Sequence, residues 1–256
     1  IVVDSAASES KKVADLVLLE RDLGVVAEGV SEGRTSFANA SKYIRIASSS
    51  NFGNICSVAA SSIFLPFVPA TATQLLLLNL CYDATCLALS WDNVDDAEIA
   101  RPKAWSGKGL GSFMLHFGFA SSAFDIITFA ILFLGVCPAV CGAPFAALDA
   151  AGRAAFIATF QAGWLLECAW TESLVLLVLR TRSVRDGDRP CRPLVMMVVV
   201  MLAASAFLSL SPAAQLLGLA PLPVWYLGIV ALLSVLYLVV VSTIKRVYLS
   251  RSSGLF

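Results

Sequence analysis

Six long apolar stretches alternate with polar segments along most of the chain after residue 45. Each is about as long as a helix that crosses a bilayer, roughly 17–25 residues, and none shows the alternation of every second position that marks a half-buried strand. The pattern therefore predicts six membrane-spanning helices rather than the strands of a barrel. The predicted spans are 46–64, 71–91, 112–136, 154–179, 193–211 and 222–244.

The first 45 residues have a different pattern. Two short apolar runs, Ile1–Val3 and Leu16–Leu19, have the length of strands and flank a segment of small and charged residues with helix potential. Three such elements are too few for a domain of their own, so we expect the closing edge of a larger cytoplasmic α/β domain. From about Leu23 the pattern becomes helical, and no proline occurs before Leu65. This predicts one long stalk helix that continues into the first span, although a separate amphipathic helix beside the membrane would also fit.

Composition supports a membrane protein. The hydrophobic fraction is 58% and the charged fraction 14%, with a mean hydropathy of +0.81. Soluble domains have about 45–50% apolar and about 25% charged residues. These values exclude a disordered chain, a nucleic-acid binder that relies on basic charge, and an ordinary soluble enzyme. The predicted fold class is mainly α: a polytopic six-helix transmembrane bundle preceded by a small cytoplasmic α/β remnant and a long stalk helix.

Basic residues predict the orientation of the bundle. In chain order from the N-terminal region to the tail, the segments outside the predicted spans carry six, none, three, one, five, none and three Lys or Arg. Cytoplasmic segments are the ones enriched in Lys and Arg. The alternation therefore predicts an integral multi-pass protein with both termini in the cytoplasm.

The formal charges within the predicted spans are all acidic: Asp83, Asp125, Glu167 and Glu172. A carboxylate in a bilayer is costly, and such groups tend to face a bundle interior or an ion path. Four acids without a Lys or Arg in the same spans favour a route for cations.

The first two spans carry polar side chains at helical spacing. Asn51 and Asn54 are three residues apart, and Asn79 and Asp83 are four apart, so each pair is expected to share one helix face. Two adjacent helices would then bring three amide oxygens and one carboxylate to a common point. Oxygen ligands of this kind suit Mg²⁺ or Ca²⁺. The alternative is that the amides only join helices through hydrogen bonds, which accounts for Asn better than for Asp83.

The other acids are open to several interpretations. Glu167 and Glu172 are five residues apart and should point to different faces of their helix, so either is a candidate for a protonated group or a proton path. Asp125 could equally cap or bond a neighbouring helix. Trp164 reads as a packing residue or an interface anchor, and Cys168 as a small apolar filler.

Several runs of residues resemble one known family. Gly33–Asn39, Lys42–Ile44, Ser49–Asn54 and Ser62–Phe67 resemble the stalk and fifth transmembrane helix of magnesium-translocating P-type ATPases, and further runs resemble the sixth to eighth helices. Those further runs are Asn79–Asp83, Trp91–Asp95, Ser121–Ile126, Phe160–Trp164 and Arg180–Arg182. The similarity covers nearly the whole chain, and the motifs stand in the family's order.

The resemblance implies a domain arrangement. Residues 1–22 would be the C-terminal edge of the phosphorylation domain, 23–45 the stalk, 46–244 transmembrane helices five to ten, and 245–256 a cytoplasmic tail. Actuator, nucleotide-binding and phosphorylation domains would precede them, bind ATP and drive inward Mg²⁺ movement through the bilayer of the plasma (inner) membrane. The Asp-Lys-Thr-Gly-Thr phosphorylation motif is absent from this sequence, so we expect the chain to be inactive as an ATPase by itself.

The resemblance also implies a set of metal ligands. Asn51, Asn54, Asn79 and Asp83 match the polar positions of the fifth and sixth helices. Glu167 matches an eighth-helix position that can carry glutamate, which makes it a possible further ligand. Glu172 stands where glutamine is usual, and this leaves ion selectivity open. The alternatives are a P-type pump for Ca²⁺, Ni²⁺ or H⁺, and a channel or structural membrane protein without ATP coupling.

Overall fold

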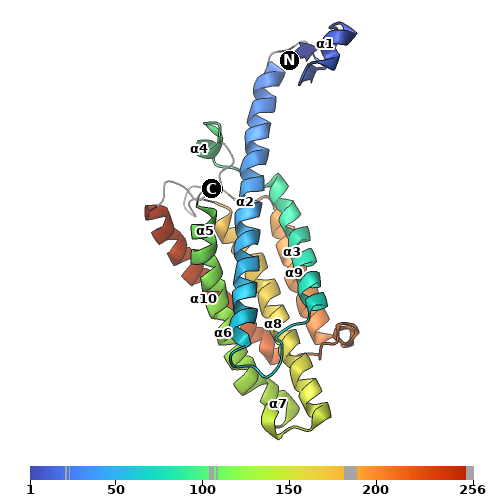
Figure 1. Ribbon diagram of the computed structural model, residues 1–256, viewed down its shortest axis with the longest axis vertical. Coiled ribbons are helices and arrows are strands. Elements are labelled where there is room, and N and C mark those ends of the chain that lie inside the picture. The colour runs from blue at the N-terminus through green and yellow to red at the C-terminus, as the bar shows by residue number, and fades with distance from the viewer. Residues whose placement is uncertain (21, 23, 104–106, 108, 182–188, 252–256) are drawn as a thin grey trace.

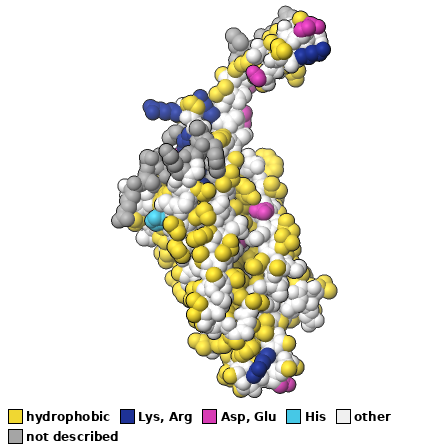
Figure 2. Space-filling view, viewed as in Figure 1, with side chains coloured by type: hydrophobic (Ala, Val, Ile, Leu, Met, Phe, Trp, Pro, Cys, Tyr) yellow, Lys and Arg dark blue, Asp and Glu magenta, His cyan; other side chains and the backbone are white. Residues whose placement is uncertain are grey.

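The computed structural model describes residues 1–20, 22, 24–103, 107, 109–181 and 189–251 (Figure 1). A bundle of long helices forms most of the molecule, and one helix projects from it toward a small N-terminal unit. Part of the predicted tail, 252–256, and the predicted start of the stalk at residue 23 lie outside the described residues. Figure 2 shows hydrophobic side chains over most of the bundle, with charged side chains mainly toward its two ends and on the projecting part.

The N-terminal unit consists of two short parallel strands joined through a helix. Strand β1 (Val2–Val3) pairs with β2 (Val17–Leu18), so that Val2 faces Val17, and α1 (Ser8–Lys12) lies between them in the sequence. The prediction of two short strands with a helix between them is confirmed, whereas their place at the edge of a larger domain stays a prediction.

Helix α2 runs without interruption from Gly24 to Ser61. Its 38 residues correspond to a length of ~57 Å at the usual rise per residue. The described helix therefore excludes the alternative of a separate amphipathic helix beside the membrane. The residues predicted as the stalk and most of the first predicted span belong to one rod.

Five helical stretches among the described residues are long and apolar enough to cross a membrane. Each agrees with a predicted span to within a few residues at most ends. They are Ala72–Trp91, Leu110–Cys141, Ala150–Leu179, Arg192–Leu210 and Val224–Ser250. Most of the first predicted span, 46–64, lies in the last part of α2, which ends at Ser61. This helix is long enough to cross a membrane, but it is too polar to be one of the five apolar helices. Its crossing of the membrane stays a prediction.

Some of these stretches are built from several elements. The first is α3 (Ala72–Cys86) followed by the 3₁₀ turn η1 (Leu87–Trp91). The second contains two π-helical turns, which shift the faces of the helix around them. Its parts are α5 (Leu110–Phe113), η2 (Met114–Gly118), α6 (Phe119–Ile131), η3 (Leu132–Val136) and α7 (Cys137–Cys141). The remaining elements are α4 (Asp96–Ile99), η4 (Phe145–Ala147), α8 (Ala150–Leu179), α9 (Arg192–Leu210), η5 (Pro212–Leu217) and α10 (Val224–Arg251).

Helix α8 is the central element of the bundle. It is the most buried of the five spans and packs against α3, α6, α9 and α10. Aromatic side chains fill the space between α8 and α6: the ring centroids of Phe129 and Trp164 are 5.1 Å apart, and those of Phe129 and Phe160 are 5.4 Å apart. Because α8 is buried on most sides, its polar residues between 159 and 173 point into protein.

Helix α2 approaches the turn η2 at close range. A Cβ atom added to Gly118 would lie 2.7 Å from Cδ1 of Phe52 and 3.0 Å from the carbonyl oxygen of Ser49, while one added to Gly53 would lie 3.0 Å from the carbonyl oxygen of Gly118. Only glycine fits such a contact without movement of the neighbouring backbone. This approach brings the next turn of α2, with Ser57, against α6.

A buried carboxylate joins four segments at the end of the bundle near the projecting helix. Asp92 follows η1, and its side chain accepts from Nη1 of Arg180 at 2.8 Å and from Nζ of Lys42 at 3.3 Å. Its backbone oxygen accepts from Nδ2 of Asn39 at 2.9 Å, and the backbone N–H of Cys191 donates to Oδ1 at 3.3 Å. The base of the stalk is thereby fixed to α3, α8 and α9.

Candidate cation site

Asp83 lies on α3 beside the base of the stalk. Its side chain is exposed, and the Tyr43 hydroxyl of α2 donates to its Oδ1 atom at 3.2 Å. Asn79, one turn earlier on α3, is half-buried. Tyr43, Asp83 and neighbouring residues of both helices line a cleft of about 560 Å³. The predicted carboxylate is therefore open to a ligand, since water or an ion can reach it through this cleft.

The start of α3 is fixed by a capping box. The Thr71 hydroxyl accepts from the backbone N–H of Gln74 at 3.3 Å, and the Gln74 side chain accepts from the backbone N–H of Thr71 at 2.9 Å. Nε2 of Gln74 donates to Oε1 of Gln161 and to the carbonyl oxygen of Leu217. These bonds hold α3 against α8 and so fix the helix that carries Asp83.

The two asparagines of α2 lie in different surroundings. Asn51 is exposed, whereas Asn54 is buried and donates from Nδ2 to Oε1 of Glu172 on α8 at 2.9 Å. Three residues of helix leave the two amides about 60° apart around the axis, so they lie on neighbouring parts of one face, but only Asn54 is buried by α8. The described hydrogen bonds link Asn54 to Glu172 and Asp83 to Tyr43. A ligand set of Asn51, Asn54, Asn79 and Asp83 stays a prediction.

A second group of acids lies in the core of the bundle, between α6 and α8. Asp125, Glu167 and Cys168 each offer one ligand atom, and these three atoms lie within 4.8 Å of one another. Their side chains are shielded from solvent, with relative exposures of 2%, 1% and 1%. We call Asp125, Glu167 and Cys168 the core acid–thiol cluster.

Asp125 is surrounded by neutral donors. Oδ2 accepts from the Ser57 hydroxyl of α2 at 2.5 Å, and Oδ1 accepts from Nε1 of Trp164 at 2.9 Å and from the Cys168 thiol at 3.6 Å. Ser57 Oγ also lies 3.0 Å from Oγ of Ser122. Of the interpretations left open for Asp125, a bond to neighbouring helices is the one the structure shows. Trp164 is more than the packing residue or interface anchor expected, because it positions this carboxyl group.

Glu167 and Glu172 face different partners, as their spacing predicted. Glu167 belongs to the core acid–thiol cluster, whereas Glu172 bonds Asn54. In both carboxyl groups the Oε2 atom is buried and has no hydrogen-bond partner among the described residues. Buried polar atoms without partners are rare in folded proteins and indicate a role beyond packing.

The two groups differ in the chemistry of their donors. The predicted set around Asp83 offers oxygen atoms alone, which suit a hard cation such as Mg²⁺. The core acid–thiol cluster adds sulfur. Sequence reasoning found all four acids but missed Tyr43, Ser57 and Cys168, because their contacts join helices that are far apart in the sequence. The glycine at position 53, one helical turn before Ser57, is the local sequence feature that agrees with a close helix contact there.

Comparison with known proteins gives the family. The model of the protein family described as "Cation transporting ATPase, C-terminus" matches residues 67–247. The chain is 37% identical over 252 residues to "Magnesium-transporting ATPase, P-type 1" of Salmonella typhimurium strain LT2, covering 98% of this chain and 26% of that protein. It is 37% identical over 253 residues to the protein of the same name from Escherichia coli strain K12, covering 98% and 27%.

More distant relatives match a smaller part. "Calcium-transporting ATPase 1" of Schizosaccharomyces pombe is 27% identical over 124 residues, which is 48% of this chain and 14% of that protein. The chain spans about a quarter of the length of the magnesium-transporting relatives. The match to more than half of the chain and the five apolar helices together decide the classification. The chain is an integral, multi-pass membrane protein region that belongs to the family of cation-transporting ATPase C-terminal domains.

Proposed function

We propose that this chain is the membrane transport portion of an ATP-driven P-type pump that imports Mg²⁺. The observation that carries the proposal is the 37% identity, over 98% of the chain, to proteins named as magnesium-transporting P-type ATPases. The exposed carboxylate of Asp83 in its cleft supports it, because the residues around it offer oxygen ligands.

In this proposal Asp83 supplies the main negative charge to Mg²⁺. Asn51, Asn54 and Asn79 supply neutral oxygens directly or through water, since Mg²⁺ keeps part of its hydration shell. Tyr43 holds the Asp83 carboxylate when the ion is absent, because its hydroxyl donates to Oδ1. The stalk, 23–45, carries the state of upstream domains to the transport domain, 46–244.

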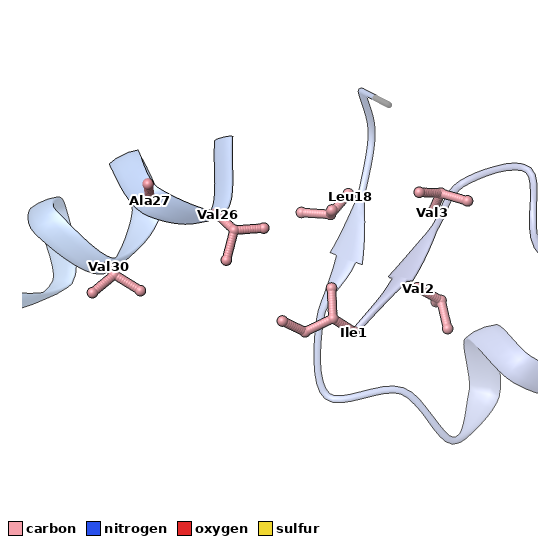
Figure 3. Close-up of a pocket in the computed structure, with 7 residues that line it drawn as sticks. All are labelled: Ile1, Val2, Val3, Leu18, Val26, Ala27 and Val30. Carbon is pink, nitrogen blue, oxygen red and sulfur yellow. The ribbon is translucent and has the colours of Figure 1, made fainter. Parts of the chain in front are cut away.

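The N-terminal unit fits the edge of a larger domain in this proposal. Side chains of Val26 and Val30 on α2, of Leu18 on β2 and of Ile1 just before β1 line an open cleft of about 690 Å³ (Figure 3). The lining is almost entirely apolar, and apolar clefts of this kind are usually covered by protein. We propose that the phosphorylation domain, together with actuator and nucleotide-binding domains that bind ATP, supplies the cover. Residues 1–22 then form its C-terminal edge.

The test uses the full-length protein that contains this chain, purified and reconstituted in vesicles. Mg²⁺-stimulated ATP hydrolysis and Mg²⁺ uptake are measured for the wild type and for Asp83→Asn. We expect the wild type to show both activities and Asp83→Asn to lose at least tenfold in apparent Mg²⁺ affinity, since about 1.4 kcal/mol of ion binding is already a factor of ten. Asp96→Asn, at an exposed site in α4, is the matched control and should keep both activities. Normal uptake by Asp83→Asn would contradict the proposed role of this carboxylate.

A pump for another cation is the main alternative. A panel of Mg²⁺, Ca²⁺, Ni²⁺ and H⁺ in the same hydrolysis assay distinguishes them by which ion stimulates turnover. Passive ion flux without ATP would instead identify a channel. An Asp-Lys-Thr-Gly-Thr motif encoded upstream of Ile1 in the same reading frame is expected for the pump.

A further inference from the structure

We propose that the core acid–thiol cluster is a second metal site, which binds a borderline divalent cation such as Zn²⁺ or Co²⁺ through Asp125, Glu167 and Cys168. It lies apart from the oxygen set around Asp83 and uses α6, which contributes nothing to that set. The inference stands independently of Mg²⁺ transport, because it rests only on the geometry and the donor atoms of the bundle core. It assigns Glu167 to this second site.

The first observation is the convergence of the donors. Two carboxyl groups and one thiol from two helices place ligand atoms within 4.8 Å of one another in a part of the bundle shielded from solvent. Bonds of about 2.0–2.3 Å to a tetrahedral cation require donors about 3.2–3.8 Å apart. The cluster therefore closes around an ion with movements of about 1 Å, which side-chain rotations supply.

The second observation is the unpartnered oxygen of Glu167. Its Oε2 atom is buried and lacks a hydrogen-bond partner within the described part of the chain, although the same carboxyl group lies in the cluster. Leaving a buried polar atom unpaired costs about 1–3 kcal/mol. A bound cation removes this cost, because it takes up a lone pair of Glu167.

Charge supports the same conclusion. The described parts of α6 and α8 within the predicted spans carry Asp125, Glu167 and Glu172 but no Lys or Arg. Buried carboxylates are found paired or coordinated to metals. A divalent cation offsets the charge of the two carboxylates, and with the Cys168 thiolate the loaded cluster carries one net negative charge. Without an ion, the ionised carboxylates have no Lys or Arg partner on the described parts of these two helices within the predicted spans.

The donor set selects the kind of metal. Thiolate ligands favour Zn²⁺ and similar ions over Mg²⁺ and Ca²⁺, which prefer oxygen. When the ion binds, the thiol proton of Cys168 is released and a metal–sulfur bond forms. Asp125 then loses the thiol as a donor but keeps the Ser57 hydroxyl and the Trp164 N–H. These two hydrogen bonds orient the carboxylate as outer-shell partners orient metal ligands.

The experiment loads the full-length protein with metal in two ways, by growth in medium with added Zn²⁺ or Co²⁺ and by incubation of the purified protein. Bound metal is measured by elemental analysis, and the Co²⁺ form is examined for a thiolate-to-metal charge-transfer band. X-ray absorption of the Zn²⁺ form should show one sulfur at about 2.3 Å and oxygens at about 2.0–2.2 Å. This measurement needs no variant and therefore does not depend on whether a variant folds.

Variants then locate the site. We expect Cys168→Ser to lose the charge-transfer band and Glu167→Gln to bind the metal at least tenfold more weakly. Cys137→Ser, which removes another buried free thiol on α7, should keep the band and the metal content. The proposal is overturned if neither loading gives bound metal, if no sulfur is found at the metal, or if the band survives in Cys168→Ser. None of these outcomes depends on whether the protein pumps Mg²⁺.

Discussion

The Nη1 atom of Arg180 lies 2.8 Å from both carboxylate oxygens of Asp92, and both side chains are shielded from solvent. Lys42 of the stalk adds a second cation at 3.3 Å. One carboxylate therefore fastens the stalk, the exit of α3 and the end of α8 to each other. A buried ion pair of this kind adds little net stability, but removal of one partner is costly because the other charge stays behind in a dry environment.

Asp92→Asn should accordingly destabilise the protein strongly. It removes the buried carboxylate that both Arg180 and Lys42 contact, and loss of one member of a buried ion pair costs about 3–5 kcal/mol. Unfolding of the purified full-length protein, followed by heat or denaturant, measures the change. Asp96→Asn, at an exposed position in α4, should alter the free energy of unfolding by less than about 0.5 kcal/mol. Equal effects of the two substitutions would show that the Asp92 contacts are not important for stability.

Gly118→Ala should separate α2 from the turn η2. The new methyl group would lie 2.7 Å from Cδ1 of Phe52 and 3.0 Å from the backbone oxygen of Ser49, and overpacking of this kind costs about 1–3 kcal/mol. Gly228→Ala on α10 is the control, because nothing lies within 4 Å of its added Cβ atom. That control should be neutral or stabilising by up to ~1 kcal/mol, as alanine is the better helix former. Unfolding measurements that rank the two variants in the opposite order would contradict the close helix contact.

Tyr43→Phe should tighten the binding of Mg²⁺. The Tyr43 hydroxyl donates to Asp83, and an ion that binds this carboxylate must replace that bond. A hydrogen bond contributes about 0.5–1.5 kcal/mol, so we expect the half-saturating Mg²⁺ concentration to fall by about 2–10-fold in the hydrolysis assay. Tyr226→Phe removes the hydroxyl that donates to the Gly163 backbone and should leave this concentration unchanged. An unchanged value in Tyr43→Phe would mean that this contact does not compete with the ion.

Asn54→Ala and Glu172→Gln should affect stability differently. The alanine variant removes the donor of the 2.9 Å bond to Oε1 of Glu172 and leaves a buried carboxyl group unpaired, at a cost of about 1–3 kcal/mol. Glutamine at 172 keeps an oxygen that can accept from Asn54, so we expect a smaller loss. Comparison of the two unfolding midpoints under one condition checks this. A larger loss for Glu172→Gln would mean that its negative charge, rather than its hydrogen bond, stabilises the core.

The predicted orientation is tested with epitope tags. A tag inserted in 65–70 should be accessible from outside intact cells, whereas a tag after residue 256 should be accessible only after permeabilisation. The reason is the distribution of Lys and Arg, which are absent from 65–70 and frequent next to the spans on the other side. The predicted topology places five spans between the two tags and so puts them on opposite sides, whereas external access to both tags would mean an even number of crossings and contradict it.

The limits of the long helices were easier to predict from the sequence than the details of their geometry. The limits of the five apolar helices follow from local composition and length, so the prediction of 154–179 comes close to the observed Ala150–Leu179. The span 46–64 is less apolar than the others because it carries several serines and asparagines. Of these, Ser49, Ser50, Asn54, Ser57 and Ser61 are buried within the bundle. The two π-helical turns in Leu110–Cys141 had no local signal that we recognised.

The site was predictable only in part. The four acids are conspicuous in an apolar sequence, but the pairing of Asp125 with Ser57 and Glu167 depends on how α2, α6 and α8 pack. Asn51 and Asn54 show how far helical spacing can be used to predict a site. Residues three positions apart can lie on opposite sides of the edge of a helix–helix interface, so that one is exposed and the other buried. A sequence pattern therefore identifies candidate ligands, whereas the groups that they join are decided by tertiary contacts.

The projecting half of α2 lies close to the balance between helix and coil. In α2, which is described throughout, none of the residues before Ala38 is buried, and Gly29 and Gly33 lower its helix propensity. A free helix of about 12–15 residues is marginal in water because nucleation is unfavourable. Here the packed half provides the nucleus, and order propagates outward from it one residue at a time. The outer turns can therefore melt and re-form while the bundle stays intact, so the stiffness of the connection to the N-terminal unit is adjustable by whatever binds there.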